Sequence, residues 1–235
     1  MPYRIATSLL RALDSHRGPG LPALPLKQAS REFGLDGLAF LLAPGGRPGE
    51  LVQVFGERTA PLEDLQLTQG QGPSPDVALS GTSILISDMA ALDPVRWPGL
   101  SVSVLQLGIR AVFAFPLRIG VIAIGVLTGH RTTPGPMTAD QLASALIVAD
   151  LLAQYLIHRG STRGDVSRLL DGAELHFAEV HQATGMLAAQ LGIDCAHALA
   201  RLRGHAFRND QRLLTIARQV LDHQLHLNTD DTGDS

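Results

Sequence analysis

The chain has 235 residues, enough for one or two domains, and its 45% apolar and 17% charged composition argues for a folded core and against disorder. The net charge of −3 excludes a global attraction to nucleic acid, so any nucleic-acid site must come from locally clustered basic residues. Cys195 is the single cysteine, which excludes an intrachain disulfide and fits the reducing cytoplasm. No apolar run reaches the roughly 18 residues of a membrane span, and the N-terminus lacks a signal-peptide pattern, so no membrane association is expected.

The first two thirds of the chain carry alternating helix and strand patterns. Apolar residues three or four apart predict helices over residues 5–13, 26–33, 57–67, 100–107 and 139–158, the third of them on the surface. Runs rich in Val, Ile, Leu and Phe predict strands over residues 37–43, 51–55, 83–86, 110–117 and 120–129.

Turn signals separate these elements. Gly34 ends the second helix, and Thr138 caps the last one. The segment PGGRPG at 44–49 and a tight turn at 118–119 each join two strands into a hairpin, whereas residues 69–75 are expected to be irregular. Residues 1–158 are therefore predicted to form an α+β domain with an antiparallel sheet flanked by helices.

Beyond a predicted linker at residues 159–165, which contains two glycines, the pattern is entirely helical. Apolar residues at spacings of three or four predict one helix of about 25 residues, 166–191, ended by Gly192. This helix would extend past two shorter helices and expose its apolar stripe, so coiled-coil pairing with a second chain is expected. A homodimer follows as a hypothesis.

The two shorter helices complete an all-α domain predicted over residues 166–226. Asp194 caps the first of them, in which Cys195 lies on the apolar face and is expected to be a small core residue. Asn209 or Asp210 is expected to cap the second. The polar, acidic residues 227–235 are expected to be a disordered tail.

Small and apolar residues recur in a fixed order between Val180 and Leu221. They are Ala183-x-Gly185-Met186-Leu187, Leu191-Gly192, Ala198, Leu202-Arg203, Ala206, Leu214 and Ala217. This segment resembles the ANTAR family, RNA-binding helical domains of transcription antiterminators built after a coiled-coil helix. One departure is Asp194-Cys195-Ala196-His197, where the family has a Ser/Thr cap followed by acidic residues, although Asp194 remains a competent cap.

The first domain carries a series of short motifs. They are Gln69-Gly70-Gln71-Gly72-Pro73, Ile86-Ser87-Asp88, Arg96-Trp97-Pro98, Gly108-x-Arg110 through Phe115-Pro116-Leu117, Gly125-x-Leu127 and Pro134-Gly135-Pro136. In this order they resemble a GAF domain of the type found ahead of ANTAR domains in actinobacteria. Many relatives carry a cysteine after the Gly-Pro pair; this chain has Ser74, which excludes thiol chemistry there.

The two resemblances together imply a transcription antitermination regulator that binds stem-loop RNA. Residues 195–225 contain five arginines against two aspartates, a local charge of +3. Arginine forks suit phosphates and the splayed bases of RNA loops. The candidate RNA-binding residues are Arg201, Arg203, Arg208, Arg212, Gln182 and Gly185. A small residue such as Gly185 permits close approach of RNA or, more commonly, of a neighbouring helix.

Other functions remain open at this stage. Three helices with a glycine near the second turn can form a helix-turn-helix-like DNA-binding unit, and the helical end could instead be a protein-interaction adaptor. No P-loop, GxSxG or Rossmann motif and no Cys/His metal spacing is present, so neither an enzyme nor a metal site is expected.

The signal of the first domain, a small molecule or a protein, and any cofactor are unknown from the sequence. A GAF fold predicts its pocket between the sheet and residues 70–108. Val77, Leu79, Ile84 and Leu105 would give that pocket an apolar lining. This lining favours a small uncharged ligand or plain core packing.

Overall fold

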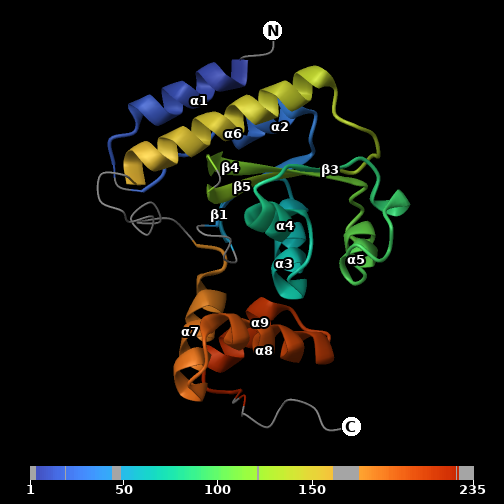
Figure 1. The fold of residues 1–235 in the computed structure, drawn as a ribbon, viewed down its shortest axis with the longest axis vertical. Helices are drawn as coiled ribbons and strands as arrows, with labels where there is room; N and C mark the ends of the chain where they lie inside the picture. Colours follow the sequence, from blue (N-terminus) through green and yellow to red (C-terminus); the bar gives the residue numbers. More distant parts are fainter. Residues whose placement is uncertain are drawn as a thin grey trace.

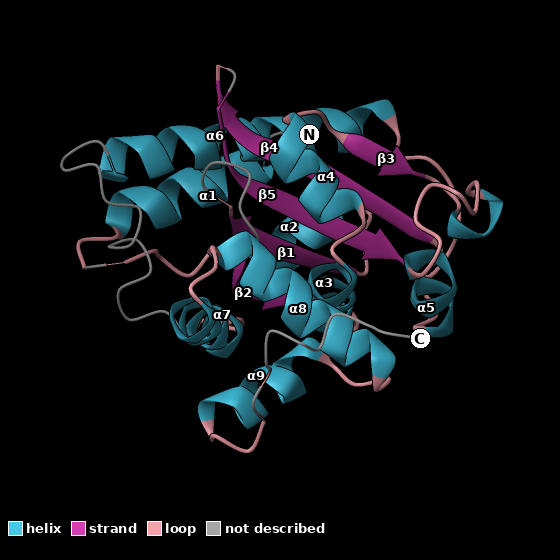
Figure 2. Ribbon diagram, turned by 60° about the horizontal axis from the view of Figure 1, so that its bottom comes forward, coloured by secondary structure: helices cyan, strands magenta, loops and turns pink. Residues whose placement is uncertain are grey.

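The structure is a computed structural model that describes residues 4–18, 20–43, 49–120, 122–160, 175–225 and 227. Its centre is an antiparallel sheet with strand order β2-β1-β5-β4-β3 (Figure 2). The strands are β1 (Gly37–Leu42), β2 (Glu50–Phe55), β3 (Ile84–Ile86), β4 (Ala111–Ile119) and β5 (Ile122–Arg131). The two predicted hairpins are confirmed, although residues 118–119, predicted as the second turn, belong to β4; pairing of β1 with β5 joins the hairpins into one sheet.

The central strands are buried on both faces, so their residues alternate between two cores. Leu38 and Phe40 of β1 point into one core, whereas Ala39 and Leu41 point into another. This period of two is the geometry of a pleated strand. It places helices against both faces of the sheet, and the predicted α+β class is confirmed.

One face is covered by α1 (Arg4–Ser15), α2 (Leu26–Phe33) and α6 (Ala139–Gly160) (Figure 1). By length and apolar composition α6 could cross a membrane. Its buried stripe packs into the core shared with α1, α2 and the sheet. The stripe is Ala145, Val148, Ala149, Leu152, Ala153 and Leu156; Leu146 lies outside it and is exposed.

Thr138 and Gln141 form a reciprocal cap at the start of α6. The Gln141 backbone N–H donates to Thr138 Oγ1 at 3.2 Å, and the Thr138 N–H donates to Gln141 Oε1 at 2.9 Å. Thr138→Ala is expected to lower the free energy of unfolding by about 1 kcal/mol, because the helix loses one of these bonds. Thermal and urea unfolding would measure this, with Thr133→Ala, an exposed threonine of the preceding loop, as the control. Equal stabilities of the two variants would contradict the expectation.

The opposite face carries α3 (Thr59–Gln69), α4 (Pro73–Ser80), the short 3-10 helix η2 (Met89–Ala91) and α5 (Leu100–Gln106). Two predictions were wrong here. The helix predicted on the surface is largely buried, because it lies between the sheet and the C-terminal helices. Residues 69–75 are not irregular throughout: after the left-handed turn at Gly70, α4 starts at Pro73, whose fixed φ suits a first helical turn.

The C-terminal bundle consists of α7 (Ala178–Leu191), α8 (Cys195–Arg208) and α9 (Leu213–Leu221). The prediction of one helix from 166 to 191 was wrong in its described part, because Leu175–Phe177 is not helical. Glu50 of β2 accepts the Phe177 N–H at 2.7 Å and so fixes the chain to the sheet before α7 begins. Residues 161–174, with most of the predicted linker, lie outside the described residues.

Three smaller expectations about the bundle also need correction. Cys195 is exposed, because the first residue of α8 lies beyond the buried stripe. Neither Asn209 nor Asp210 caps α9; Asp210 is left-handed, and the helix starts after Arg212 without a side-chain cap. Leu227, placed in the tail by its sequence, is buried against the bundle; residues 228–235 lie outside the described part. The Asp194 cap is confirmed by its bond from the His197 N–H.

Candidate functional site

The C-terminal bundle does not stand apart from the sheet domain. Its core residues, among them Phe177 and Leu202, form one cluster with Leu41, Leu51 and Leu67 of β1, β2 and α3. Figure 1 shows the bundle below α3 and the β1 end of the sheet. The apolar stripe that predicted a coiled coil with a second chain is, for residues 178–191, buried within the chain itself. Homodimerisation, if it occurs, therefore needs a surface other than this stripe.

Arg203 of α8 is fixed at the carboxyl end of α3. Its Nε donates to the Leu67 carbonyl oxygen at 2.7 Å. This carbonyl belongs to the last turn of α3, where backbone oxygens lack helical partners and carry partial negative charge. The guanidinium also lies against Gly70, where a Cβ would come within 2.9 Å of its Nη1. Burial lowers the pKa of Arg203 from its ordinary value.

Arg212 makes the second polar contact between the bundle and α3. Its Nε lies 2.9 Å from Oδ2 of the buried Asp64. Burial raises the pKa of the Asp64 carboxyl, while Arg212 and His176 oppose that rise. The Leu213 N–H, next in the chain, donates to Thr68 Oγ1 at 3.4 Å. We call the contact of Arg203 and Arg212 with Asp64, Leu67 and Gly70 the α3 junction.

The other predicted site residues lie away from the α3 junction. Arg201 is half-buried and Arg208 exposed, two turns apart on α8, whereas Gln182 and Gly185 are exposed on α7. The structure thus brings together Arg203 with Arg212 at α3, and Arg201 with Arg208 along one helix.

Phe207 is a surface residue that the sequence analysis missed. It lies beside Arg208, and 81% of it is exposed. The buried stripe of α8 is Ala198, Leu199, Leu202 and Ala206, so Phe207 points away from the core. The sequence feature that could have identified it is an aromatic residue outside the apolar stripe and next to an arginine. A flat exposed ring of this kind suits base stacking.

A polar network is buried between α3, α4 and the sheet. Ser74 Oγ lies 2.7 Å from Thr128 Oγ1 of β5 and donates to Glu63 Oε1 at 3.1 Å. Gln66 holds the same serine, accepting its backbone N–H at 2.8 Å and donating to its Oγ at 3.2 Å. Burial raises the pKa of Glu63 to about 8, although the bonds from Ser74 and Gln66 oppose the rise. Glu63 is therefore mostly protonated at neutral pH.

This network occupies the region where an apolar ligand pocket was predicted. Val77 is buried in a core cluster there, with Ile84 packed against it, and Leu105 packs against a neighbouring cluster. Leu79, however, is 74% exposed and lines nothing. Two hollows outlined by the described residues lie on the other side of the sheet, around α1. A ligand that enters between α3, α4 and the sheet must displace packed side chains.

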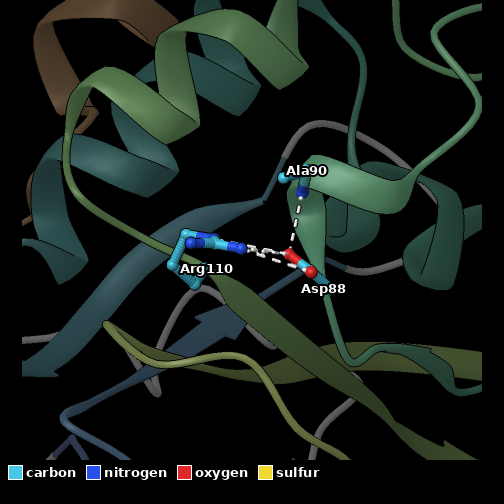
Figure 3. Close-up of polar contacts among 3 residues, drawn as sticks. All are labelled: Asp88, Ala90 and Arg110. Carbon is cyan, nitrogen blue, oxygen red and sulfur yellow. Dashed lines mark hydrogen bonds and ion pairs between the residues drawn. The ribbon is translucent and has the colours of Figure 1, made fainter.

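An ion pair ties the loop after β3 to the start of β4 (Figure 3). Arg110 donates to both carboxylate oxygens of Asp88, with the shortest contact, Nη2 to Oδ1, at 3.0 Å. The Ala90 N–H donates to the same carboxylate. These hydrogen bonds, that from Ala90 first, lower the pKa of Asp88. The two sequence motifs that contain Asp88 and Arg110 are thus brought together as a structural clamp.

Comparison with known proteins bears on the first two thirds of the chain. The sequence model of the GAF domain family matches residues 26–156. The GAF domain of an Acinetobacter phosphoenolpyruvate-protein phosphotransferase superposes with a TM-score of 0.53 at 11% identity, over 69% of this chain and 96% of that chain. The corresponding Coxiella burnetii domain gives a TM-score of 0.48 at 14% identity, over 68% and 95%. Among curated proteins no sequence match is found.

Proposed function

The chain belongs to the GAF domain family through residues 26–156, and from this premise we propose that the sensory GAF domain controls a C-terminal unit that binds stem-loop RNA. In this proposal the protein is a cytoplasmic regulator of transcription antitermination. The resemblance of residues 180–221 to ANTAR domains supports the choice of RNA. The signal would be a small molecule or a protein partner of the GAF domain.

The observation that carries the proposal is the division of the arginines between two surfaces. Arg203 and Arg212 are held at the α3 junction. Phe207 and Arg208 face outward on α8. In the docked arrangement only part of the proposed RNA-binding surface faces outward. Undocking would uncover the Arg203 guanidinium and release that of Arg212, which is exposed but paired with Asp64, so a signal that weakens the junction would strengthen RNA binding.

The α3 junction can be weakened without touching a proposed RNA contact. Asp64→Asn removes the charge that holds Arg212 and keeps the shape of the side chain. We expect the full chain to bind a stem-loop RNA about five-fold more tightly. An ion pair whose arginine side chain is 66% exposed is screened by solvent and is worth only about 1 kcal/mol. Fluorescence anisotropy with a labelled hairpin measures this change.

The matched control is Glu57→Gln, which removes an exposed carboxylate just before α3. It should leave the affinity within two-fold of the unchanged chain. Equal tightening by both variants would mean that general charge, and not the α3 junction, sets the affinity. Weaker binding by Asp64→Asn would contradict control through this contact.

Two other functions are separated by the same assay. A helix-turn-helix-like DNA-binding regulator would bind duplex DNA tightly and ignore hairpin RNA. A protein-interaction adaptor would bind neither. The RNA proposal requires saturable hairpin binding that declines with added salt, because arginine contacts to phosphates release counterions.

A further inference from the structure

A polar groove lies between α1 and α2, on the helical layer that faces away from the C-terminal bundle (Figure 1). Its volume is about 640 Å³, within the range of small-molecule sites. Three arginines line it: Arg4 and Arg11 from α1, and Arg31 from α2. No purely apolar side chain contributes to its wall.

The amphipathic pattern of the two helices creates this groove. Ile5, Leu9 and Leu13 of α1 are buried, which leaves Arg4 and Arg11, seven residues apart, together on the polar face. In α2 the buried side is formed by Leu26, Ala29 and Phe33. Gln28 and Arg31, three residues apart, therefore share the outer side that meets α1.

Positive charge in the groove is poorly compensated. Glu32 is the one carboxylate in its wall, and its Oε2 already accepts the Ile5 N–H at 3.0 Å. Within the described part of the chain, no carboxylate forms an ion pair with Arg4, Arg11 or Arg31. Other arginines of the chain do have such partners, as in the Arg110–Asp88 and Arg218–Glu179 pairs. An anion in the groove would supply the missing charge.

The groove also offers neutral hydrogen-bonding groups. Thr7 and Ser8 place hydroxyls on the α1 wall, and Gln28 places an amide on the α2 wall. Glu32 Oε1 is buried and accepts no hydrogen bond from the described residues. Because Oε1 is buried, a ligand in the groove cannot reach it, and the Ser8 hydroxyl and the Gln28 amide are the groups that can bond a ligand's hydroxyls.

We propose that the α1–α2 groove binds a small phosphate-bearing molecule with hydroxyl groups, such as a sugar phosphate. The guanidinium groups of Arg4, Arg11 and Arg31 hold the phosphate, and Ser8 and Gln28 bond the hydroxyl groups. The site lies on the face of the sheet opposite α3, and it is independent of the RNA proposal.

Isothermal titration of the full chain with ribose 5-phosphate and with inorganic phosphate tests this site. We expect saturable binding, tighter for the sugar phosphate, and about ten-fold weaker binding by Arg31→Ala because one charge-assisted contact is lost. Lys27→Ala is the matched control, since it removes an exposed cation from the same helix outside the groove. The affinity of Lys27→Ala for ribose 5-phosphate should stay within two-fold of that of the unchanged chain.

Several results would overturn the assignment. No saturable binding at millimolar ribose 5-phosphate, or equal losses in Arg31→Ala and Lys27→Ala, would show only diffuse surface charge. Sugar phosphate binding no tighter than that of inorganic phosphate would remove the role of Ser8 and Gln28. Flotation with phosphatidic acid vesicles, without binding of ribose 5-phosphate, would assign the phosphate to a lipid. Hairpin RNA affinity should not change in Arg31→Ala, so failure here is distinguishable from failure of the RNA proposal.

Discussion

Replacing Phe207 and Arg208 together by alanine should weaken stem-loop RNA binding by about a hundred-fold. Stacking of one base on an aromatic ring contributes about 1–3 kcal/mol, and loss of a guanidinium contact to phosphate adds to it. The combined loss of about 3 kcal/mol corresponds to two orders of magnitude. Fluorescence anisotropy with the labelled hairpin measures it directly.

Folding should survive this change, because Phe207 and Arg208 are exposed and lie outside the α8 stripe. Circular dichroism and thermal unfolding check this point. Leu79→Ala removes an equally exposed apolar side chain from α4, far along the chain from the bundle, and should leave RNA affinity unchanged. Undiminished RNA binding by the Phe207→Ala, Arg208→Ala chain would place the RNA on another surface.

Glu63→Gln should make the protein more stable at pH 8 by roughly 3 kcal/mol, and much less so at pH 5. Burial raises the pKa of Glu63 from 4.5 to about 8. Between these values the folded chain holds a proton that the unfolded chain releases, so stability falls as pH rises. Glutamine keeps the hydrogen-bonded shape next to Ser74 and cannot ionise. Urea unfolding across this range is the measurement.

Titration of His130 changes the folding stability in the opposite direction to that of Glu63. It therefore limits the pH range in which the effect of Glu63 can be measured alone. Burial, its largest cause, lowers the pKa of His130 to about 4. The unfolded chain therefore binds a proton below about pH 6.5 that the folded chain does not, and stability falls as pH decreases towards 4. Above pH 6.5 only Glu63 of this pair contributes a slope. Parallel curves of stability against pH for the unchanged chain and Glu63→Gln between pH 6.5 and 8 would refute the buried, protonated state of Glu63. Glu57→Gln, the exposed control, should keep the pH dependence of the unchanged chain.

Local sequence signals were sufficient for much of the fold. Gly34 ends α2 in the left-handed conformation, and Asp194 caps α8, both as predicted. Apolar runs separated by turn signals predicted the two hairpins. These features depend on neighbours within a few residues, which is the range over which residue patterns carry information.

The α3 junction could not be predicted in this way. Helical periodicity shows which face of α8 is buried but not which segment packs along the edges of that face. Arg203 was therefore expected in the RNA-binding surface, whereas it lies against Leu67, 136 residues away in sequence. The helix at residues 57–67 was predicted on the surface, yet its Glu63 and Asp64 are buried, because their partners, Ser74 and Arg212, become neighbours only in the folded chain. Phe207 was recognisable in principle as an aromatic residue outside the α8 stripe.

We propose that the C-terminal bundle, docked on the GAF domain through α3, binds structured RNA. Sequencing of RNA crosslinked to the protein in its own cells tests this most directly, with the Phe207→Ala, Arg208→Ala chain expressed alongside. We expect enrichment of stem-loop RNAs by the unchanged chain and their loss from the variant. Recovery of no enriched RNA, or of the same RNAs from both chains, would contradict it.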